Sequence, residues 1–258
     1  MKIHVFGTCA GTEPMPNRKH VSFAIERDNK IYWFDAGEGC SYTAHLMGVD
    51  LLSIKSIFIS HPHMDHIGGL GNLLWNIRKI DGMTGRELEG KQIEVYMPNM
   101  DSWDGLMKLL KNTEGGFKCS FDIKANRIED GIIYDRDGFK VSTIHNLHMQ
   151  KTEDDRWQSF SFMIEADDKR IVYSGDIKSM DDISSLIDTC DILLVETGHH
   201  TVEYVCNYIK DEGKDVKKLA FIHNGRAIMD DVEGELKKAK SIFGEDVIIT
   251  EDGMTIEI

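Results

Sequence analysis

A segment dense in metal-ligand residues follows a short apolar strand and reads Ser60-His61-Pro62-His63-Met64-Asp65-His66-Ile67-Gly68-Gly69. It places three histidines and one aspartate within residues 61–66. Imidazole and carboxylate groups are good ligands for zinc and similar divalent metals. A loop between a strand and a helix can turn alternate side chains toward different points, so His61 and His63 can share one metal while Asp65 and His66 reach a second. The density of ligand-type residues favours a metal site over the alternative, a polar loop with solvated histidines.

Length and composition place this segment in an ordinary globular chain. The 258 residues are 41% hydrophobic and 29% charged, which excludes low-complexity, collagen-like and coiled-coil proteins. No linker rich in Pro, Gly or Ser divides the sequence, so we expect a single domain over residues 1–258. The absence of an apolar run of about 18 residues argues against a membrane-spanning helix, and residues 1–7 are typical of a first strand, not a signal peptide.

The net charge and the cysteine content limit which binding partners and which cellular compartment are expected for this chain. Thirty Lys and Arg against 44 Asp and Glu give a net charge of −14, and such a chain repels polyanions on average. A broad nucleic-acid-binding surface is therefore not expected. The five cysteines are odd in number, scattered and without a CxxC pair, which predicts a reduced, cytoplasmic environment.

Hydrophobic patterning predicts a mixed α/β fold. Apolar stretches predict strands over 54–60, 93–97, 120–124, 139–145, 159–166, 170–174, 191–196, 218–223, 246–250 and 254–258. Helical spacing predicts helices over 41–47, 70–79, 103–110, 181–187, 202–211 and 231–243. Two strand-rich halves with interspersed helices indicate two sheets packed face to face with helices outside.

Residues 61–66 resemble the metallo-β-lactamase superfamily, whose signature is His-x-His-x-Asp-His. The resemblance covers almost the whole chain, and the matching blocks come in the family's order. It implies an α/β fold, the four-layer αββα sandwich, with a metal site at one edge between the two sheets. It also implies two divalent metal ions, with zinc expected and manganese or iron as alternatives.

The resemblance implies three further ligands downstream. The first is a histidine at a strand end, for which both His145 and His148 qualify; the spacing to the strand at 159–162 favours His148. The second is a bridging aspartate in a Ser-Gly-Asp context, which Asp176 matches, and the third is a late histidine, His223. The implied set is His61, His63 and His148 for one metal, Asp65, His66 and His223 for the other, and Asp176 as the bridge.

Several blocks resemble the ribonuclease Z branch and its phosphodiesterase relatives. They are Gly7-Thr8 with Gly11-Thr12, Asp35-Ala36-Gly37-Glu38-Gly39, Glu196 after a strand, Gly198-His199-His200-Thr201, and His223-Asn224-Gly225-Arg226. The resemblance implies that Asp65 orients the nucleophile and that Arg226 neutralises phosphoryl oxygens. It also implies that His199, held by Glu196, protonates the leaving oxygen.

The chain departs from that branch in three ways. His200 stands where the branch has a serine, only two residues separate Glu196 from His199, and there is no inserted arm rich in Gly, Pro and basic residues to grip transfer RNA. These departures disfavour a transfer-RNA substrate and leave the hydrolytic residues intact.

The sequence thus predicts a dinuclear metal-dependent hydrolase, a phosphodiesterase of small-molecule or nucleotide substrates. The alternatives are a hydrolase of lactones, thioesters or related esters, a di-iron redox protein, and a metal-binding scaffold for partners. We expect no membrane partner, and relatives suggest a homodimer. Trp157, close after His148, is either a lid residue or part of an exposed loop.

Overall fold

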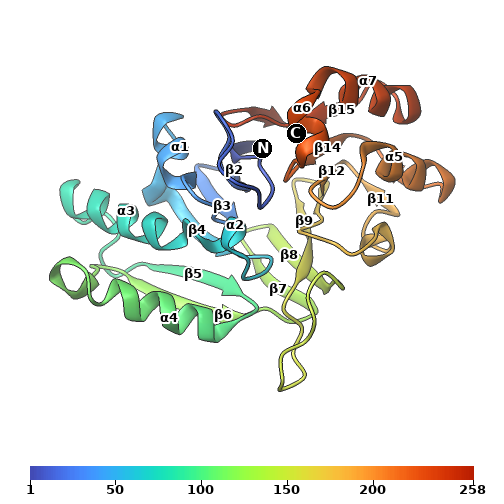
Figure 1. Cartoon of the computed structure of the whole chain (residues 1–258). Coiled ribbons are helices and arrows are strands. Elements are labelled where there is room, and N and C mark those ends of the chain that lie inside the picture. Colours follow the sequence, from blue (N-terminus) through green and yellow to red (C-terminus); the bar gives the residue numbers. More distant parts are fainter. The chain divides into compact units, whose positions relative to one another are not determined.

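A computed structural model describes all 258 residues, and the chain forms two compact units. Unit 1 comprises Met1–Gly7, Pro16–Arg127 and Glu251–Ile258; unit 2 comprises Thr8–Met15 and Ile128–Thr250. Each unit contains one seven-stranded sheet (Figure 1). The single domain over 1–258 stays a prediction.

The sheet of unit 1 has the order β16-β1-β2-β3-β4-β5-β6. Its strands are β1 Lys2–Gly7, β2 Ser22–Arg27, β3 Lys30–Phe34, β4 Ile54–Phe58, β5 Gln92–Met97, β6 Asp122–Arg127 and β16 Thr255–Glu257. The strands from β16 to β3 are antiparallel, and those from β3 to β6 are parallel. Asp28 and Asn29 form the tight turn between β2 and β3 with positive φ, as expected for a hairpin.

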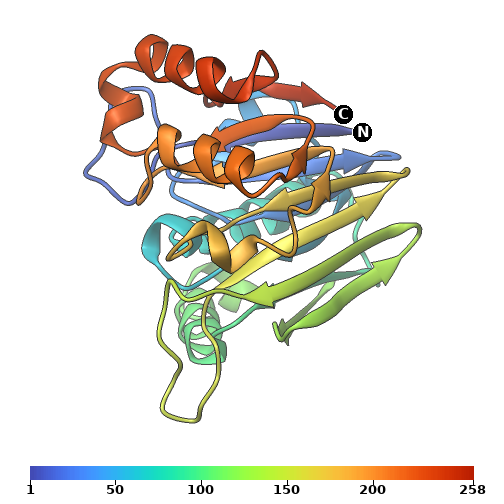
Figure 2. The same ribbon diagram turned by 90° about the vertical axis from the view of Figure 1, so that its right-hand side faces the viewer.

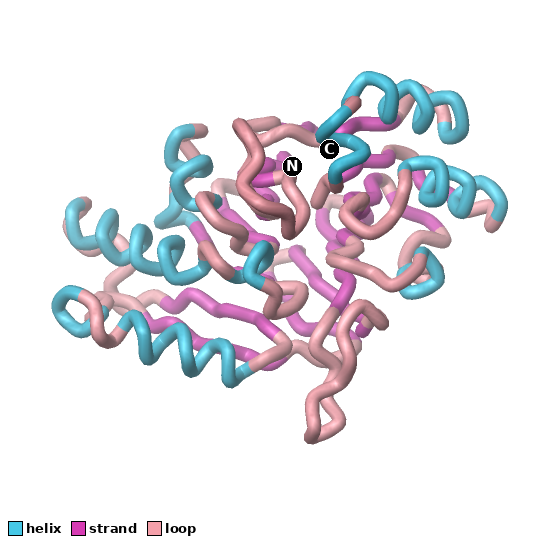
Figure 3. The backbone as a smooth tube through the Cα atoms, viewed as in Figure 1, coloured by secondary structure: helices cyan, strands magenta, loops and turns pink.

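Helices cover one face of this sheet (Figure 3). They are α1 Cys40–Leu46, α3 Leu70–Met83 and α4 Met100–Leu110, with short turns α2 Met64–Ile67, η1 Leu51–Ser53 and η2 Glu114–Phe117. Trp33 packs among the apolar residues of these helices, so its neighbour Phe34 lies on the opposite face. There Phe34 is part of an aromatic stack that crosses four strands, Phe23, Phe34, Phe58 and Tyr96, with ring centroids 5.0–5.1 Å apart.

The sheet of unit 2 has the order β15-β14-β12-β10-β9-β8-β7. Its strands are β7 Gly131–Arg136, β8 Phe139–His145, β9 Phe160–Ala166, β10 Lys169–Tyr173, β12 Ile192–Glu196, β14 Leu219–Ile222 and β15 Val247–Ile249. Strands β7 to β10 are antiparallel, and β10, β12, β14 and β15 are parallel. The remaining elements are α5 Val202–Asp211, α6 Arg226–Asp230, α7 Val232–Phe243, η3 Met180–Ile183, and the two-residue strands β11 Thr189–Cys190 and β13 Asp215–Val216.

Each sheet gathers its metal-ligand-type residues at one edge. In unit 1, Asp35 follows β3 and residues 60–66 follow β4. In unit 2, Asp176 follows β10, Glu196 ends β12, and His223 follows β14. Carboxyl ends of parallel strands meet at a common edge, where α/β proteins bind their ligands. His148 belongs to the long loop 146–159 between β8 and β9, which Figure 2 shows extending from unit 2.

One predicted helix is wrong. Residues 181–187 form only a short 3-10 turn at Met180–Ile183, followed by turns. The Asp182 carboxylate accepts hydrogen bonds from the backbone N–H of Lys178 at 2.8 Å and of Leu147 at 3.2 Å. Aspartate and serine side chains compete with helical hydrogen bonding in this way, and the segment 181–185 contains two aspartates and two serines.

None of the helices is both long enough and apolar enough to cross a membrane.

Candidate metal centre

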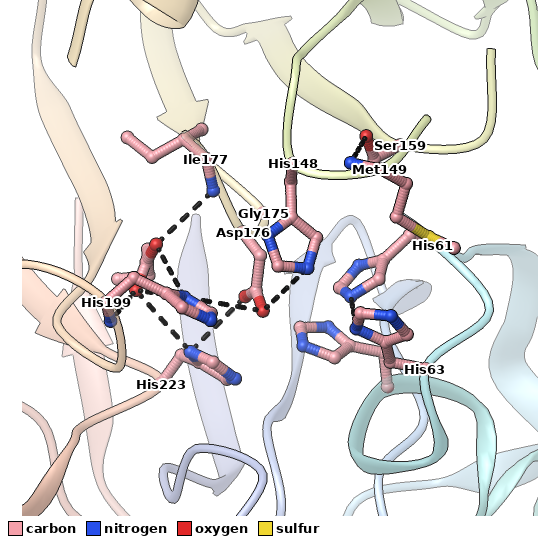
Figure 4. A network of polar contacts seen from close by, with 12 residues as sticks. His61, His63, His148, Met149, Ser159, Gly175, Asp176, Ile177, His199 and His223 are labelled. Carbon is pink, nitrogen blue, oxygen red and sulfur yellow. Dashed lines mark hydrogen bonds and ion pairs between the residues drawn. The ribbon is translucent and has the colours of Figure 1, made fainter. Parts of the chain in front are cut away.

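Two histidines of unit 1 point their ring nitrogens at each other. His61 is fully buried and His63 is exposed, and the His61 Nε2 atom lies 3.0 Å from the His63 Nδ1 atom (Figure 4). The backbone positions them because His61 follows buried strand β4 and His63 precedes the first turn of α2. A divalent cation can bind two such converging imidazole nitrogens.

Asp35 fixes the orientation of the neighbouring candidate ligands. Its buried carboxylate accepts hydrogen bonds from the backbone N–H of Ser60 at 2.7 Å and from the Ser60 hydroxyl at 2.8 Å, and it lies 2.7 Å from His66 Nδ1. The Ser60 hydroxyl also lies 3.0 Å from His61 Nδ1. With both Nδ1 atoms engaged, His61 and His66 present Nε2, the pattern by which a second residue orients metal-binding histidines. His66 Nε2 lies 3.5 Å from Asp65 Oδ2.

The family block Asp35-Ala36-Gly37-Glu38-Gly39 contains Asp35 but does not by itself predict this role. The signal was present as an aspartate at a strand end before Ala36-Gly37. Asp35 adopts φ 49°, a left-handed conformation that aspartate tolerates better than most residues.

Asp176 is the centre of the cluster in unit 2. Its buried carboxylate lies 3.6 Å from His148 Nε2 and 3.2 Å from His223 Nδ1, each distance measured to a different oxygen. The two contacts are drawn as dashed lines in Figure 4. A carboxylate with one oxygen toward each of two histidines has the arrangement expected of a bridging ligand.

The structure gives His145 and His148, the two candidates for the third histidine ligand, different surroundings. His145 lies at the end of β8, where its Nδ1 atom is 2.7 Å from Asp130 Oδ2 and its ring stacks on Trp157 with centroids 4.1 Å apart. His148, in contrast, faces Asp176. This placement supports His148 as the ligand and gives Trp157 a packing partner at the base of the loop.

Glu196 and His199 form a hydrogen-bonded pair beside Asp176. The fully buried Glu196 carboxylate accepts from the backbone N–H of His199 at 2.8 Å and from that of Ile177 at 3.3 Å, and lies 3.0 Å from His199 Nδ1. Burial raises the pKa of Glu196, but the hydrogen bond from His199 and the His223 ring, whose Nδ1 atom is 3.8 Å from Glu196 Oε2, outweigh it and lower the pKa to about 2. The hydrogen bond to Glu196 in turn raises the pKa of His199.

His200 anchors a different loop. Its Nε2 atom lies 3.1 Å from the backbone oxygen of Ile177, the residue after Asp176.

The Arg226 side chain lies at the protein surface, unlike the buried Glu196 carboxylate. It begins α6, and its guanidinium forms an ion pair with Glu13 in which both side chains are 59% exposed. The predicted contact of Arg226 with phosphoryl oxygens therefore stays a prediction.

The donor set fits a divalent metal of the zinc, manganese or iron type. Unit 1 offers His61, His63, Asp65 and His66. In unit 2, one ligand atom from each of Asp176, Glu196, His199 and His223 lies within 4.8 Å of the others. Imidazole with carboxylate, without thiolate, suits these metals, and none of the five cysteines belongs to either cluster or forms a disulfide bond.

Comparison with known proteins agrees with this description. The family model described as Anti-Pycsar protein Apyc1 matches residues 1–204. Ribonuclease Z of Archaeoglobus fulgidus is 24% identical over an alignment of 313 residues that spans 100% of this chain and 97% of that protein.

Two solved structures share the fold. The metallo-β-lactamase fold protein YhfI from Bacillus subtilis has a TM-score of 0.75 at 18% identity and covers 99% of this chain and 98% of its own. Human tRNase Z, short form, has a TM-score of 0.75 at 20% identity and covers 100% and 99%. The predicted α/β fold of the metallo-β-lactamase type and the predicted resemblance to the ribonuclease Z branch are confirmed.

Proposed function

This chain belongs to the Anti-Pycsar protein Apyc1 family, and we propose that it hydrolyses phosphodiester bonds at a dinuclear metal centre. It is a metal-dependent hydrolase, as the sequence predicted, and the phosphodiesterase class fits its relatives. The observation that carries the proposal is the pairing of imidazoles with Asp176, at 3.6 Å for His148 and 3.2 Å for His223.

The ligand set follows the order of the family blocks. His61, His63 and His148 would hold one metal, Asp65, His66 and His223 the other, and Asp176 would bridge them. Two zinc ions are proposed, with manganese or iron as alternatives. When bound, such a pair supplies positive charge at the reacting phosphoryl group and lowers the pKa of water.

The remaining residues would protonate the leaving group, orient the nucleophile and contact the phosphoryl oxygens. Glu196 receives the Nδ1 hydrogen of His199 at 3.0 Å, so the opposite ring nitrogen, Nε2, is the atom from which His199 would protonate the leaving oxygen. Asp65, 3.5 Å from His66 Nε2, would orient the nucleophile. Arg226 would reach phosphoryl oxygens after leaving Glu13, an exposed ion pair of the kind that is weak in water.

The substrate we propose is a small-molecule or nucleotide phosphodiester. The net charge of −14 and the absence of a basic arm argue against transfer RNA. Cytoplasmic location and a homodimer stay predictions.

Metal content and hydrolysis of bis(p-nitrophenyl) phosphate, measured together, test the proposal. We expect about two metals per chain and turnover that chelation removes. His63→Ala and Asp176→Ala should lose both bound metal and turnover. His45→Ala, an exposed histidine on α1, is the control and should behave as the wild type.

Three results would contradict the proposal. Retained turnover in His63→Ala or Asp176→Ala would remove these ligands from the mechanism. Two bound metals without phosphodiester turnover would redirect the assignment to lactone or thioester hydrolysis, and a wild type that binds no metal would leave the partner-binding scaffold.

A further inference from the structure

The loop that carries His148 is held by side chains at three consecutive backbone positions. The N–H of Leu147 donates to Asp182 Oδ2 at 3.2 Å, that of His148 to Asn146 Oδ1 at 3.2 Å, and that of Met149 to Ser159 Oγ at 3.1 Å. Figure 4 shows the last of these above the ring of His148. Residues 146–159 lie between strands, so no ladder of strand hydrogen bonds fixes this backbone.

Asn146 ties the two ends of the loop together from inside unit 2. It is 1% exposed, its N–H donates to the backbone oxygen of Ser159 at 3.0 Å, and its own backbone oxygen accepts from Ser159 Oγ at 3.1 Å. Its amide nitrogen donates to Ser161 Oγ at 3.1 Å. Because Ser159 and Ser161 are also fully buried, water cannot replace these partners at low cost.

The network continues from the His148 loop to the loop that carries Asp176. Ser161 Oγ donates to the backbone oxygen of Ser174 at 2.5 Å. The Ser174 hydroxyl donates to the oxygen of Gly175 at 2.6 Å and accepts from the backbone N–H of Glu196 at 3.1 Å. One chain of hydrogen bonds therefore reaches the backbone beside His148, beside Asp176 and at Glu196.

We propose that Asn146 is a positioning residue that, through Ser161 and Ser174, sets the distance between His148 and Asp176. The inference rests on the proposed metal-binding role of those two side chains. The physical reason is rigidity: a ligand on a long loop costs conformational entropy when metal orders it, and the buried network orders the loop beforehand. Metal affinity is then the property that Asn146 controls, whereas proton transfer is not.

Metal titration of the chelator-stripped full-length protein tests this. Asn146→Ala removes the acceptor for His148 N–H and the donor to Ser161. Ser161→Ala removes the acceptor for the Asn146 amide and the donor to Ser174, but it keeps the acceptor for His148 N–H. We expect each to weaken Zn²⁺ binding by about 10- to 100-fold, the usual effect of losing a residue that orients a metal ligand. At saturating Zn²⁺ the kcat for bis(p-nitrophenyl) phosphate should return toward the wild-type value.

The control is Ser56→Ala, which removes a fully buried hydroxyl from β4 in unit 1. It should leave Zn²⁺ affinity unchanged, and the melting temperature of each metal-free variant reports any general loss of folding. If Asn146→Ala does not fold, Ser161→Ala, the smaller change, decides.

Wild-type Zn²⁺ affinity in a folded Ser161→Ala or Asn146→Ala, with the wild type binding two metals, would overturn this inference and leave the proposed function standing. A kcat that stays low at saturating Zn²⁺ would also overturn it. A wild type that binds none of Zn²⁺, Mn²⁺ and Fe²⁺ would overturn both.

Discussion

At the scale of single residues, two buried side chains of the candidate site belong to residues with left-handed backbone conformations. Asp35 and His223 both adopt positive φ, at 49° and 52°. Such conformations cost free energy in residues other than glycine and collect at functional sites. Asp35 directly follows β3, and His223 directly follows β14. The ends of these two strands therefore hold both residues in place.

Asp35→Asn should weaken metal binding. The amide has one acceptor oxygen in place of two, so it cannot serve Ser60 and His66 together. We expect metal affinity to fall by about 10- to 100-fold and unfolding free energy to fall by about 1–3 kcal/mol, measured by metal titration and urea unfolding.

The control for Asp35 is Asp50→Asn. Asp50 caps the turn at Leu51–Ser53 by accepting from Leu52 N–H at 3.0 Å, and asparagine caps as well as aspartate. Metal binding of Asp35→Asn equal to that of this control would remove Asp35 from the site.

Gly198→Ala should displace His223. A Cβ atom on Gly198 would lie 2.7 Å from His223 Nδ1, closer than real Cβ contacts allow, and 3.0 Å from the Ala10 Cβ atom. Moving a ligand by about 1 Å can reduce turnover by about 100-fold. We expect at least a tenfold lower kcat/KM for bis(p-nitrophenyl) phosphate; unchanged kinetics would show that His223 is not needed where it lies.

The candidate ligands that the sequence predicts are those that a short local motif identifies. His61, His63, Asp65 and His66 are neighbours in sequence, and Asp176 has a characteristic Ser-Gly-Asp context. Asn146 could not be predicted in its role, because its partners are 13 and 15 residues away and meet it only after the strands pair.

At the scale of elements, two helices were predicted correctly because their apolar periodicity begins at an N-cap residue. Helices predicted over 202–211 and 231–243 are α5 Val202–Asp211 and α7 Val232–Phe243. Thr201 and Asp231 accept hydrogen bonds from Tyr204 and Gly234 N–H at 3.2 and 2.9 Å. Prediction missed β7 Gly131–Arg136, whose residues are mostly exposed and carry no apolar alternation.

Two substitutions at helix α4 should change the free energy of unfolding in opposite directions. Gly105→Ala puts a Cβ atom into open space on an exposed helical position and should stabilise the protein by about 0.5–1 kcal/mol. Asn99→Ala removes the oxygen that accepts from Ser102 N–H at 2.9 Å and should cost about 1 kcal/mol.

Urea unfolding of both α4 variants gives the comparison, and neither change should alter turnover. The same sign of change in the two variants would show that local helix energetics do not set stability here.

At the scale of the whole molecule, the charge of −14 sets how substrates approach. We expect kcat/KM for bis(p-nitrophenyl) phosphate to change by less than about threefold between 50 and 200 mM salt, because few phosphates are neutralised. A protein that grips RNA through 6–10 phosphates loses about 10³- to 10⁵-fold in affinity over that range. A steep loss of activity toward pre-transfer RNA with salt would contradict the preference for small diesters.

The course of the chain has a consequence for dissection of the protein. The backbone passes from one unit to the other after Gly7, after Met15, after Arg127 and after Thr250. A protease cut after Arg127 therefore yields two fragments that each hold pieces of both units, and the second fragment keeps β16, which pairs with β1 of the first. The nicked protein should stay together as a complex, and a gene divided at that codon should yield folded protein only when both halves are expressed in the same cell.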